Sequence, residues 1–118
     1  MNVEQLCEYC ISKPGVSESF PFDNVTLVLK VGSKIFALIS LEGEISMNLK
    51  CNPEKAIELR EMYSCVLPGY HMNKQHWNTV LIDGSVSNKL ICSWIDHSYN
   101  LVLEGLTKKE KELILQLK

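Results

Sequence analysis

Arginine and net positive charge are scarce in this sequence. Arg60 is the only arginine, and the 118 residues carry a formal net charge of -2. A protein that binds duplex DNA by neutralising phosphates is normally basic or has a basic stripe, and arginine makes most bidentate contacts to guanine and phosphate. The sequence therefore argues against a duplex-binding protein of that electrostatic type.

Long apolar runs and export signals are missing as well. No apolar stretch is long enough to cross a bilayer, and the first residues do not combine a basic segment with an apolar one. The five cysteines are an odd number, which in a chain without an export signal indicates reduced thiols. We therefore expect a soluble cytoplasmic protein with no disulfides and no membrane partner.

The pattern of apolar residues predicts one α+β domain over residues 1–118. Apolar residues make up 46% of the chain, enough for a single core. Helical spacing and capping residues predict helices at residues 3–11, 53–63, 88–104 and 108–117, and alternating stretches predict strands at residues 26–31, 34–40, 45–50 and 77–82. The order αβββαβαα describes an antiparallel sheet, a three-stranded meander plus a further strand, packed with helices. Residues 16–24 are expected to be an ordered loop whose Phe20 and Phe22 cover an edge of the core.

Alternation along the meander predicts one apolar face and one mixed face. Leu27, Leu29, Ile35 and Ala37 fall on the core side in this pattern. The mixed face is expected to carry Lys30, Lys34, Asn48 and Lys50, together with the apolar Val28, Phe36 and Leu38. If this face lies beside Lys74, its three lysines form a local basic patch in an acidic protein.

Residues 68–79 have the highest density of side chains that can take part in binding or chemistry. They hold two of the three histidines, one tryptophan, a lysine and two asparagines, without an acidic residue. Between a Pro-Gly turn and an apolar pair, this composition favours a loop that runs into a strand and presents polar groups at a surface. As a nucleic-acid surface, Lys74 would contact phosphate, Asn73 and Asn78 base edges or sugar, and Trp77 a base by stacking, beside His71 and His76.

A structural interpretation of the same stretch is also open. Trp77 and Tyr70 could be core or edge anchors, which is the commoner place for such residues, and the asparagines and His71 could satisfy loop backbone groups. For the aromatic residues this structural interpretation is favoured.

Metal binding and catalysis have weaker support. His71 and His76 do not share the spacing of one helical turn or one strand face, and Cys7 and Cys10 form a single C-x-x-C without a second pair. We therefore expect no metal and no cofactor. Cys51, Cys65 and the other cysteines are expected to be buried thiols. No nucleophile motif or phosphate loop is present, and neighbours in Asp96-His97-Ser98-Tyr99 point in different directions along a helix. We expect no enzymatic activity and a core position for Tyr99. His97 is expected to be a polar helix flank or to make a hydrogen bond to a loop.

Several motifs in order along the chain resemble the MmcQ/YjbR family. They are Lys13-Pro14-Gly15, Phe20-Pro21-Phe22, Asn48-Leu49-Lys50-Cys51, Pro68-Gly69-Tyr70-His71-Met72-Asn73-Lys74, His76-Trp77-Asn78-Thr79 and Asp96-His97-Ser98-Tyr99. The resemblance covers nearly the whole chain. It implies a small bacterial cytoplasmic protein with an α+β fold similar to secretion chaperones and CyaY, which binds DNA through a double-wing arrangement of strands and loops and brings no catalytic mechanism.

Two functions therefore follow from the sequence. The first is binding of DNA by a surface made of Lys30, Lys34, Asn48, Lys50, His71, Asn73, Lys74, His76, Trp77 and Asn78. The second is protein interaction, chaperone-like or as a homodimer, through Val28, Phe36 and Leu38 on the mixed face of the sheet.

Overall fold

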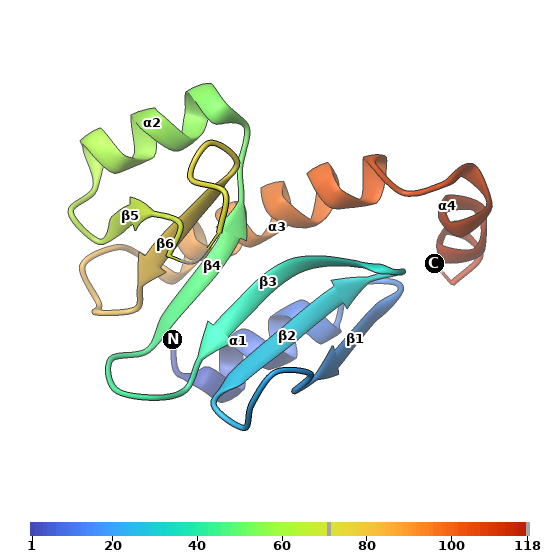
Figure 1. The fold of residues 1–118 in the computed structure, drawn as a ribbon, viewed down its shortest axis with the longest axis horizontal. Helices are drawn as coiled ribbons and strands as arrows, with labels where there is room; N and C mark the ends of the chain where they lie inside the picture. The colour runs from blue at the N-terminus through green and yellow to red at the C-terminus, as the bar shows by residue number, and fades with distance from the viewer. Residues whose placement is uncertain (71, 118) are drawn as a thin grey trace.

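A six-stranded antiparallel sheet runs through the middle of the molecule (Figure 1). The computed structural model describes residues 1–70 and 72–117. Its strands are β1 (Val16–Ser19), β2 (Thr26–Val31), β3 (Lys34–Ser40), β4 (Ser46–Lys50), β5 (Val66–Pro68) and β6 (Trp77–Leu81), and their order in the sheet is β1-β2-β3-β4-β6-β5. The predicted meander and fourth strand are confirmed, and the two short edge strands β1 and β5 are additions to the prediction.

Three of the four helices described pack against one face of this sheet. These three are α1 (Val3–Ile11), α2 (Pro53–Met62) and α3 (Asn88–Glu104), and the fourth is α4 (Lys108–Leu115). Asn2, Asn52, Ser87 and Thr107 cap their N-termini by accepting a hydrogen bond from a backbone N–H in the first turn. α3 supplies most of the buried helical side chains, as predicted, and these pack with the inward residues of β2, β3, β4 and β6 in one core.

α4 lies at the end of the molecule beside the β2–β3 hairpin (Figure 1). It is joined to the core through Ile114, which packs against the backbone of Gly15 and Gly32. Both glycines have positive φ angles, 76° and 57°, and a Cβ atom at Gly15 would come within 2.7 Å of Ile114 Cγ1. Only glycine therefore allows this approach without strain.

A β-bulge in β3 overturns part of the predicted face pattern. Leu29 pairs with Ala37 but Lys30 pairs with Ile35, so Phe36 is the extra residue. Phe36 is fully buried, and its ring meets the ring of Tyr99 edge-on at 5.5 Å. The predictions that Phe36 lies on the mixed face and Ile35 on the core face are wrong, because one extra residue reverses the alternation.

The same bulge moves Lys34 to the helical side. Its Nζ donates to the carbonyl oxygen of Gly105 at the end of α3, at 3.0 Å. Lys34 therefore does not share a face with Lys30 and Lys50, and the predicted patch of three lysines is wrong in this respect.

Ser98 connects α3 to the bulge. Its Oγ donates to the carbonyl oxygen of Phe36 at 2.5 Å and accepts from the backbone N–H of Lys50 at 2.8 Å, and the residue is fully buried. A bulge leaves backbone groups without ladder partners, and this hydroxyl satisfies one such group on β3 while also bonding β4. The long helix is thereby fixed against the middle of the sheet.

Residues 16–24 are not the covering loop predicted from the sequence. The first part is the edge strand β1, and Phe20 and Phe22 are 48% and 70% exposed. These two rings are therefore available at the surface.

Candidate functional site

No helix of the described residues covers the sheet face opposite α1, α2 and α3, which we call the outer face. Val28 and Leu38 on this face are nevertheless only 0% and 8% exposed, so they do not form the open patch predicted for protein interaction. Paired residues of an antiparallel ladder share a face, so the register places on it the row Thr26, Ser40, Ser46 and Leu81, and the row Val28, Leu38, Asn48, Thr79 and Leu67. In Figure 1 the sheet lies in front of α1 and α3, with this face toward the reader.

The outer face has positive charge and no acidic strand residue. Lys30 and Lys50 lie on it, because each follows an outward residue by two positions. The one acidic strand residue, Glu18, pairs with Leu29 and so points to the helical side. Lys30 and Lys50 belong to strands separated only by β3, which puts their backbones about 10 Å apart. Two of the three predicted strand lysines therefore form a basic pair on an open surface.

Trp77 is placed next to this pair. It pairs with Lys50 across β4 and β6, and it is partly exposed. Tyr70, in the loop between β5 and β6, is 68% exposed. Of the expected positions as core or edge anchors, the core position is therefore wrong for Tyr70, and Trp77 is only partly buried.

Asn48 is on the outer face but its amide is already bonded. Its Nδ2 donates to the carbonyl oxygen of Tyr70 at 3.3 Å, and its Oδ1 accepts from Thr79 Oγ1 at 2.5 Å. Thr79 Oγ1 in turn accepts from the backbone N–H of Tyr70 at 2.9 Å. Asn48 and Thr79 therefore hold the loop at Tyr70 by both of its backbone groups.

Asn78 is a structural residue. It is 2% exposed on the helical side, where its Oδ1 accepts from Arg60 Nε at 2.7 Å and its Nδ2 donates to the carbonyl oxygen of Ala56 at 3.3 Å. Its predicted contact with a base edge is not compatible with this burial.

The only arginine is also used internally. Besides Asn78, the Arg60 guanidinium donates to the carbonyl oxygens of Lys74 and Trp77. Asn73 bends the same segment, since its side chain accepts from the backbone N–H of Gln75 and its carbonyl oxygen from those of His76 and Trp77. Asn73 and Lys74 are exposed at the tip, and His76 is partly buried. His71, also predicted for this surface, lies outside the described residues.

A groove of about 630 Å³ is cut into the outer face. The central strands form its floor with Thr26, Leu38, Ser40, Ser46 and Asn48. Its sides come from the loops and from β5 and β6, with Phe22, Leu67, Tyr70, Met72 and Leu81. Sequence reasoning missed Phe22, Ser40, Ser46 and Tyr70 as site residues. The signal for Ser40 and Ser46 was present, because the turn between the predicted strands brings them close together.

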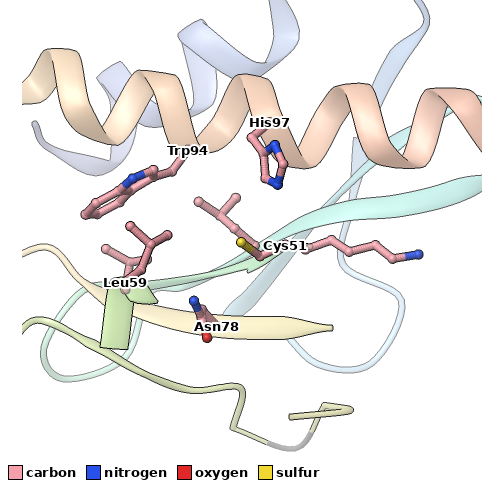
Figure 2. Close-up of a pocket in the computed structure, with 8 residues that line it drawn as sticks. Cys51, Leu59, Asn78, Trp94 and His97 are labelled. Atoms are coloured by element: carbon pink, nitrogen blue, oxygen red, sulfur yellow. The ribbon is translucent and has the colours of Figure 1, made fainter. Parts of the chain in front are cut away.

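A second opening, on the helical side, is far smaller. Figure 2 shows it between α2, α3 and the sheet, where His97 points from α3 toward Cys51 and the Trp94 ring lies over Leu59. Its volume is about 10 Å³, room for a single water molecule at most. The side chains there pack as a core and leave no space for a substrate.

His97 makes the predicted hydrogen bond to a loop. Its Nε2 accepts from the backbone N–H of Asn52 at 3.2 Å, so this nitrogen carries no proton. Burial, with a smaller effect from the charge of Lys55, lowers the pKa of His97 below its ordinary 6.5.

We expect this histidine to make the folded state less stable in acid. As the pH falls through 6.5, the unfolded chain takes up a proton that the folded imidazole resists, so stability is complete above 6.5 and declines below it. Urea unfolding at about pH 7.5 and about pH 5.5 should show a smaller loss for His97→Gln, which keeps an acceptor and does not titrate, than for the unmodified protein. An equal loss in both proteins would contradict this role.

The remaining titratable residues show no assembled centre. All five cysteines are free, and burial raises the pKa of the Cys10 thiol to about 12. Asp96 accepts from Tyr9 Oη at 2.7 Å and pairs with Lys13 at 2.5 Å, whereas its neighbour His97 contacts Asn52. Within residues 1–70 and 72–117 no three His, Cys, Asp or Glu side chains are grouped for a metal ion, and no helix is both long and apolar enough to cross a membrane.

The motifs of the sequence are those of a known family. The family model described as YjbR matches residues 11–101, which is more than half of the chain. The chain belongs to the YjbR family. The match includes every strand of the sheet and therefore the whole outer face.

Individual YjbR relatives extend this match. The YjbR protein of Escherichia coli K12 is 36% identical over 118 residues, which is 99% of this chain and all of the relative. The YbdF protein of Escherichia coli O157:H7 is 39% identical over 86% of this chain and 84% of its own length.

Solved structures of related proteins have the same fold. A crystal structure of a Deinococcus radiodurans protein with a DUF419 domain is 38% identical and superposes with a TM-score of 0.89 over 96% of this chain and 87% of that one. A Pseudomonas syringae protein gives 30% identity and a TM-score of 0.76 over 86% of this chain and 98% of its own. These agreements establish the α+β architecture for the family member described above.

Proposed function

We propose that this YjbR-family chain binds nucleic acid, DNA in the first instance, on the outer face of its sheet, and that it acts by binding and not by catalysis. The observation that supports this proposal most is the composition of that face. It is uncovered by helices, carries Lys30 and Lys50 with no acidic strand residue, and has Trp77 beside Lys50. Lysines on a backbone track beside exposed aromatic rings are the elements by which proteins hold single strands.

The overall charge sets the strength of this interaction. With a net charge of -2 and its one arginine bonded to Asn78, Lys74 and Trp77, the protein has few phosphate contacts to offer. The affinity should therefore be modest and highest at low salt.

Reversing the two outer-face lysines should weaken DNA binding. For Lys30→Glu/Lys50→Glu we expect an affinity at least about tenfold lower at about 50 mM salt. The slope of log K against log salt concentration should become less steep by about 1.4, because each lost phosphate contact on a single strand removes about 0.7. Fluorescence anisotropy with labelled single-stranded and duplex DNA at two salt concentrations measures both quantities.

The matched control is Lys89→Glu/Lys109→Glu. Both of these lysines are exposed, and they lie on α3 and α4, away from the outer face. The control has the same net charge as the test variant and should retain binding much better. Equal affinities and equal salt slopes for the two variants would contradict the proposed surface.

Self-association through the outer face is a second candidate. It is favoured by apolar side chains that remain open there, since Phe22, Leu67 and Tyr70 are 70%, 42% and 68% exposed. Sedimentation velocity of the protein without nucleic acid separates the two functions: a stable dimer favours self-association, and a monomer favours the nucleic-acid surface.

A further inference from the structure

The groove in the outer face has the size of a ligand site. Its volume of about 630 Å³ falls within the roughly 300–1,000 Å³ typical of small-molecule pockets. It lies toward the end of the face formed by Thr26, Ser40 and Ser46, whereas Lys30 and Lys50 lie toward the opposite end of the same strands. The groove and the lysines are therefore neighbouring but distinct parts of one surface.

Two hydroxyl groups stand side by side on the floor of the groove. Ser40 and Ser46 are directly opposite each other on β3 and β4, so their Cβ atoms are about 5 Å apart. In the described part of the chain neither side chain makes a hydrogen bond within the protein. A serine hydroxyl both donates and accepts, so the pair can match donors and acceptors on the edge of a flat polar ring.

Aromatic rings on pinned loops form the sides. Tyr70 is held through its backbone by Asn48 and Thr79, and the loop after Phe22 is closed by Asp23, whose Oδ1 accepts from the backbone N–H groups of Val25 and Thr26 at 3.0 and 2.7 Å. Both rings are about two-thirds exposed, on loops that these hydrogen bonds hold at or next to the ring-bearing residue. Rings presented in this way lose little freedom when a flat molecule stacks on them.

The charge around the groove selects the kind of occupant. No charged side chain among residues 1–70 and 72–117 lines it, and acidic residues lie in the turns at its far end, namely Asp23, Glu42, Glu44 and Asp83. A phosphate would be repelled there, whereas a neutral heterocycle with a polar edge would find apolar walls, stacking rings and free hydroxyls. Phosphates are instead favoured at the other end, by Lys30 and Lys50.

We propose that the groove holds one unpaired nucleobase of a single-stranded nucleic acid, with the sugar-phosphate backbone running toward Lys50 and Lys30. This inference rests on the proposed nucleic-acid function and specifies its ligand. A base within a duplex is stacked and has its edge paired, so it cannot enter the groove without being extruded. The protein should therefore prefer single strands to duplex of the same sequence.

The test compares groove variants with matched controls outside the groove. Phe22→Ala and Ser40→Val/Ser46→Val change the groove, and Phe20→Ala and Ser17→Val/Ser19→Val make the same chemical changes outside it. All of these positions are exposed or partly exposed, so the variants should fold, which thermal unfolding confirms. Anisotropy with a labelled mixed-sequence single strand and its duplex is measured for each protein at low salt.

The groove variants should bind the single strand about tenfold more weakly, as expected for losing one stacked base, while duplex binding and both controls stay unchanged. Equal effects of groove and control variants, or equal loss of duplex and single-strand binding, would overturn the inference. If Lys30→Glu/Lys50→Glu abolishes binding and the groove variants do not alter it, the nucleic-acid function stands and the base pocket is wrong.

Free nucleosides test whether the groove binds a base on its own or only as part of a strand. Adenosine, guanosine, cytidine or thymidine is added, and the chemical-shift perturbation of the protein is measured. A perturbation centred on Ser40 and Ser46 that is lost in Ser40→Val/Ser46→Val supports the base pocket. If such a perturbation is seen but no strand binds, only the proposed nucleic-acid function fails. No perturbation by any nucleoside, together with a dimer that Phe22→Ala dissociates, would show that the groove is a protein interface and overturn the inference.

Discussion

Replacing Phe36 with alanine is expected to lower the free energy of unfolding by about 3–5 kcal/mol. The ring is fully buried and packs edge-on against Tyr99 at 5.5 Å, so its removal leaves a cavity in the centre of the core. The bulge adds to this effect, because its geometry is fixed by Ser98 bonding the Phe36 carbonyl and cannot easily close around the cavity. Urea unfolding followed by circular dichroism measures the change.

Phe22→Ala is the matched control for that measurement. The same atoms are removed from a ring that is 70% exposed, so the free energy of unfolding should change by no more than about 0.5 kcal/mol. Similar losses in the two variants would mean that Phe36 is not in the core. A glutamate at position 36 should unfold the protein, which makes it unsuitable for testing an interface.

Replacing Arg60 with alanine is expected to cost about 2–3 kcal/mol. The guanidinium joins the buried Oδ1 of Asn78 to the carbonyl oxygens of Lys74 and Trp77, and without it a nearly inaccessible amide oxygen loses its charged donor. Arg60→Lys should recover only part of this loss, since an ammonium group cannot reproduce the planar fork.

A double-mutant cycle identifies the source of the Arg60 effect. If the pair is coupled, Arg60→Ala/Asn78→Ala should cost clearly less than the sum of the two single changes. Glu58→Ala, an exposed change on the same helix, should have little effect. Additive single changes would show that Arg60 acts mainly through the loop carbonyls.

The sequence was sufficient for the elements with strong periodicity and clear caps. α3 was predicted from helical spacing and a capping residue, and β2 and β3 from two alternating stretches on either side of Gly32. β1 and β5 were not predicted, because strands of four and three residues at a sheet edge show little alternation of apolar and polar residues. Their existence depends on pairing with β2 and β6 and not on local sequence.

The sequence was sufficient to predict several residues of the candidate site, but not which face of the sheet each side chain occupies. Lys30, Lys50 and Trp77 fell on the outer face because their strands alternate regularly, whereas the single extra residue at Phe36 moved Lys34 to the other side. Asn78 and Arg60 illustrate a different difficulty. These polar side chains are suited to binding a ligand, but they form hydrogen bonds with each other or with the backbone between α2 and β6. No local sequence pattern indicates such long-range hydrogen bonds.

The attachment of α4 has a consequence for how the molecule opens. Ile114 is the buried side chain of this helix and packs on two glycines, and a hydrogen bond from the backbone N–H of Ser33 to the Glu110 carboxylate adds to this contact. Such an element can detach while the sheet and α3 remain intact, because few contacts are lost and none supports the outer face. The carboxyl end of the chain is accordingly the natural place for a fused reporter or a surface tether.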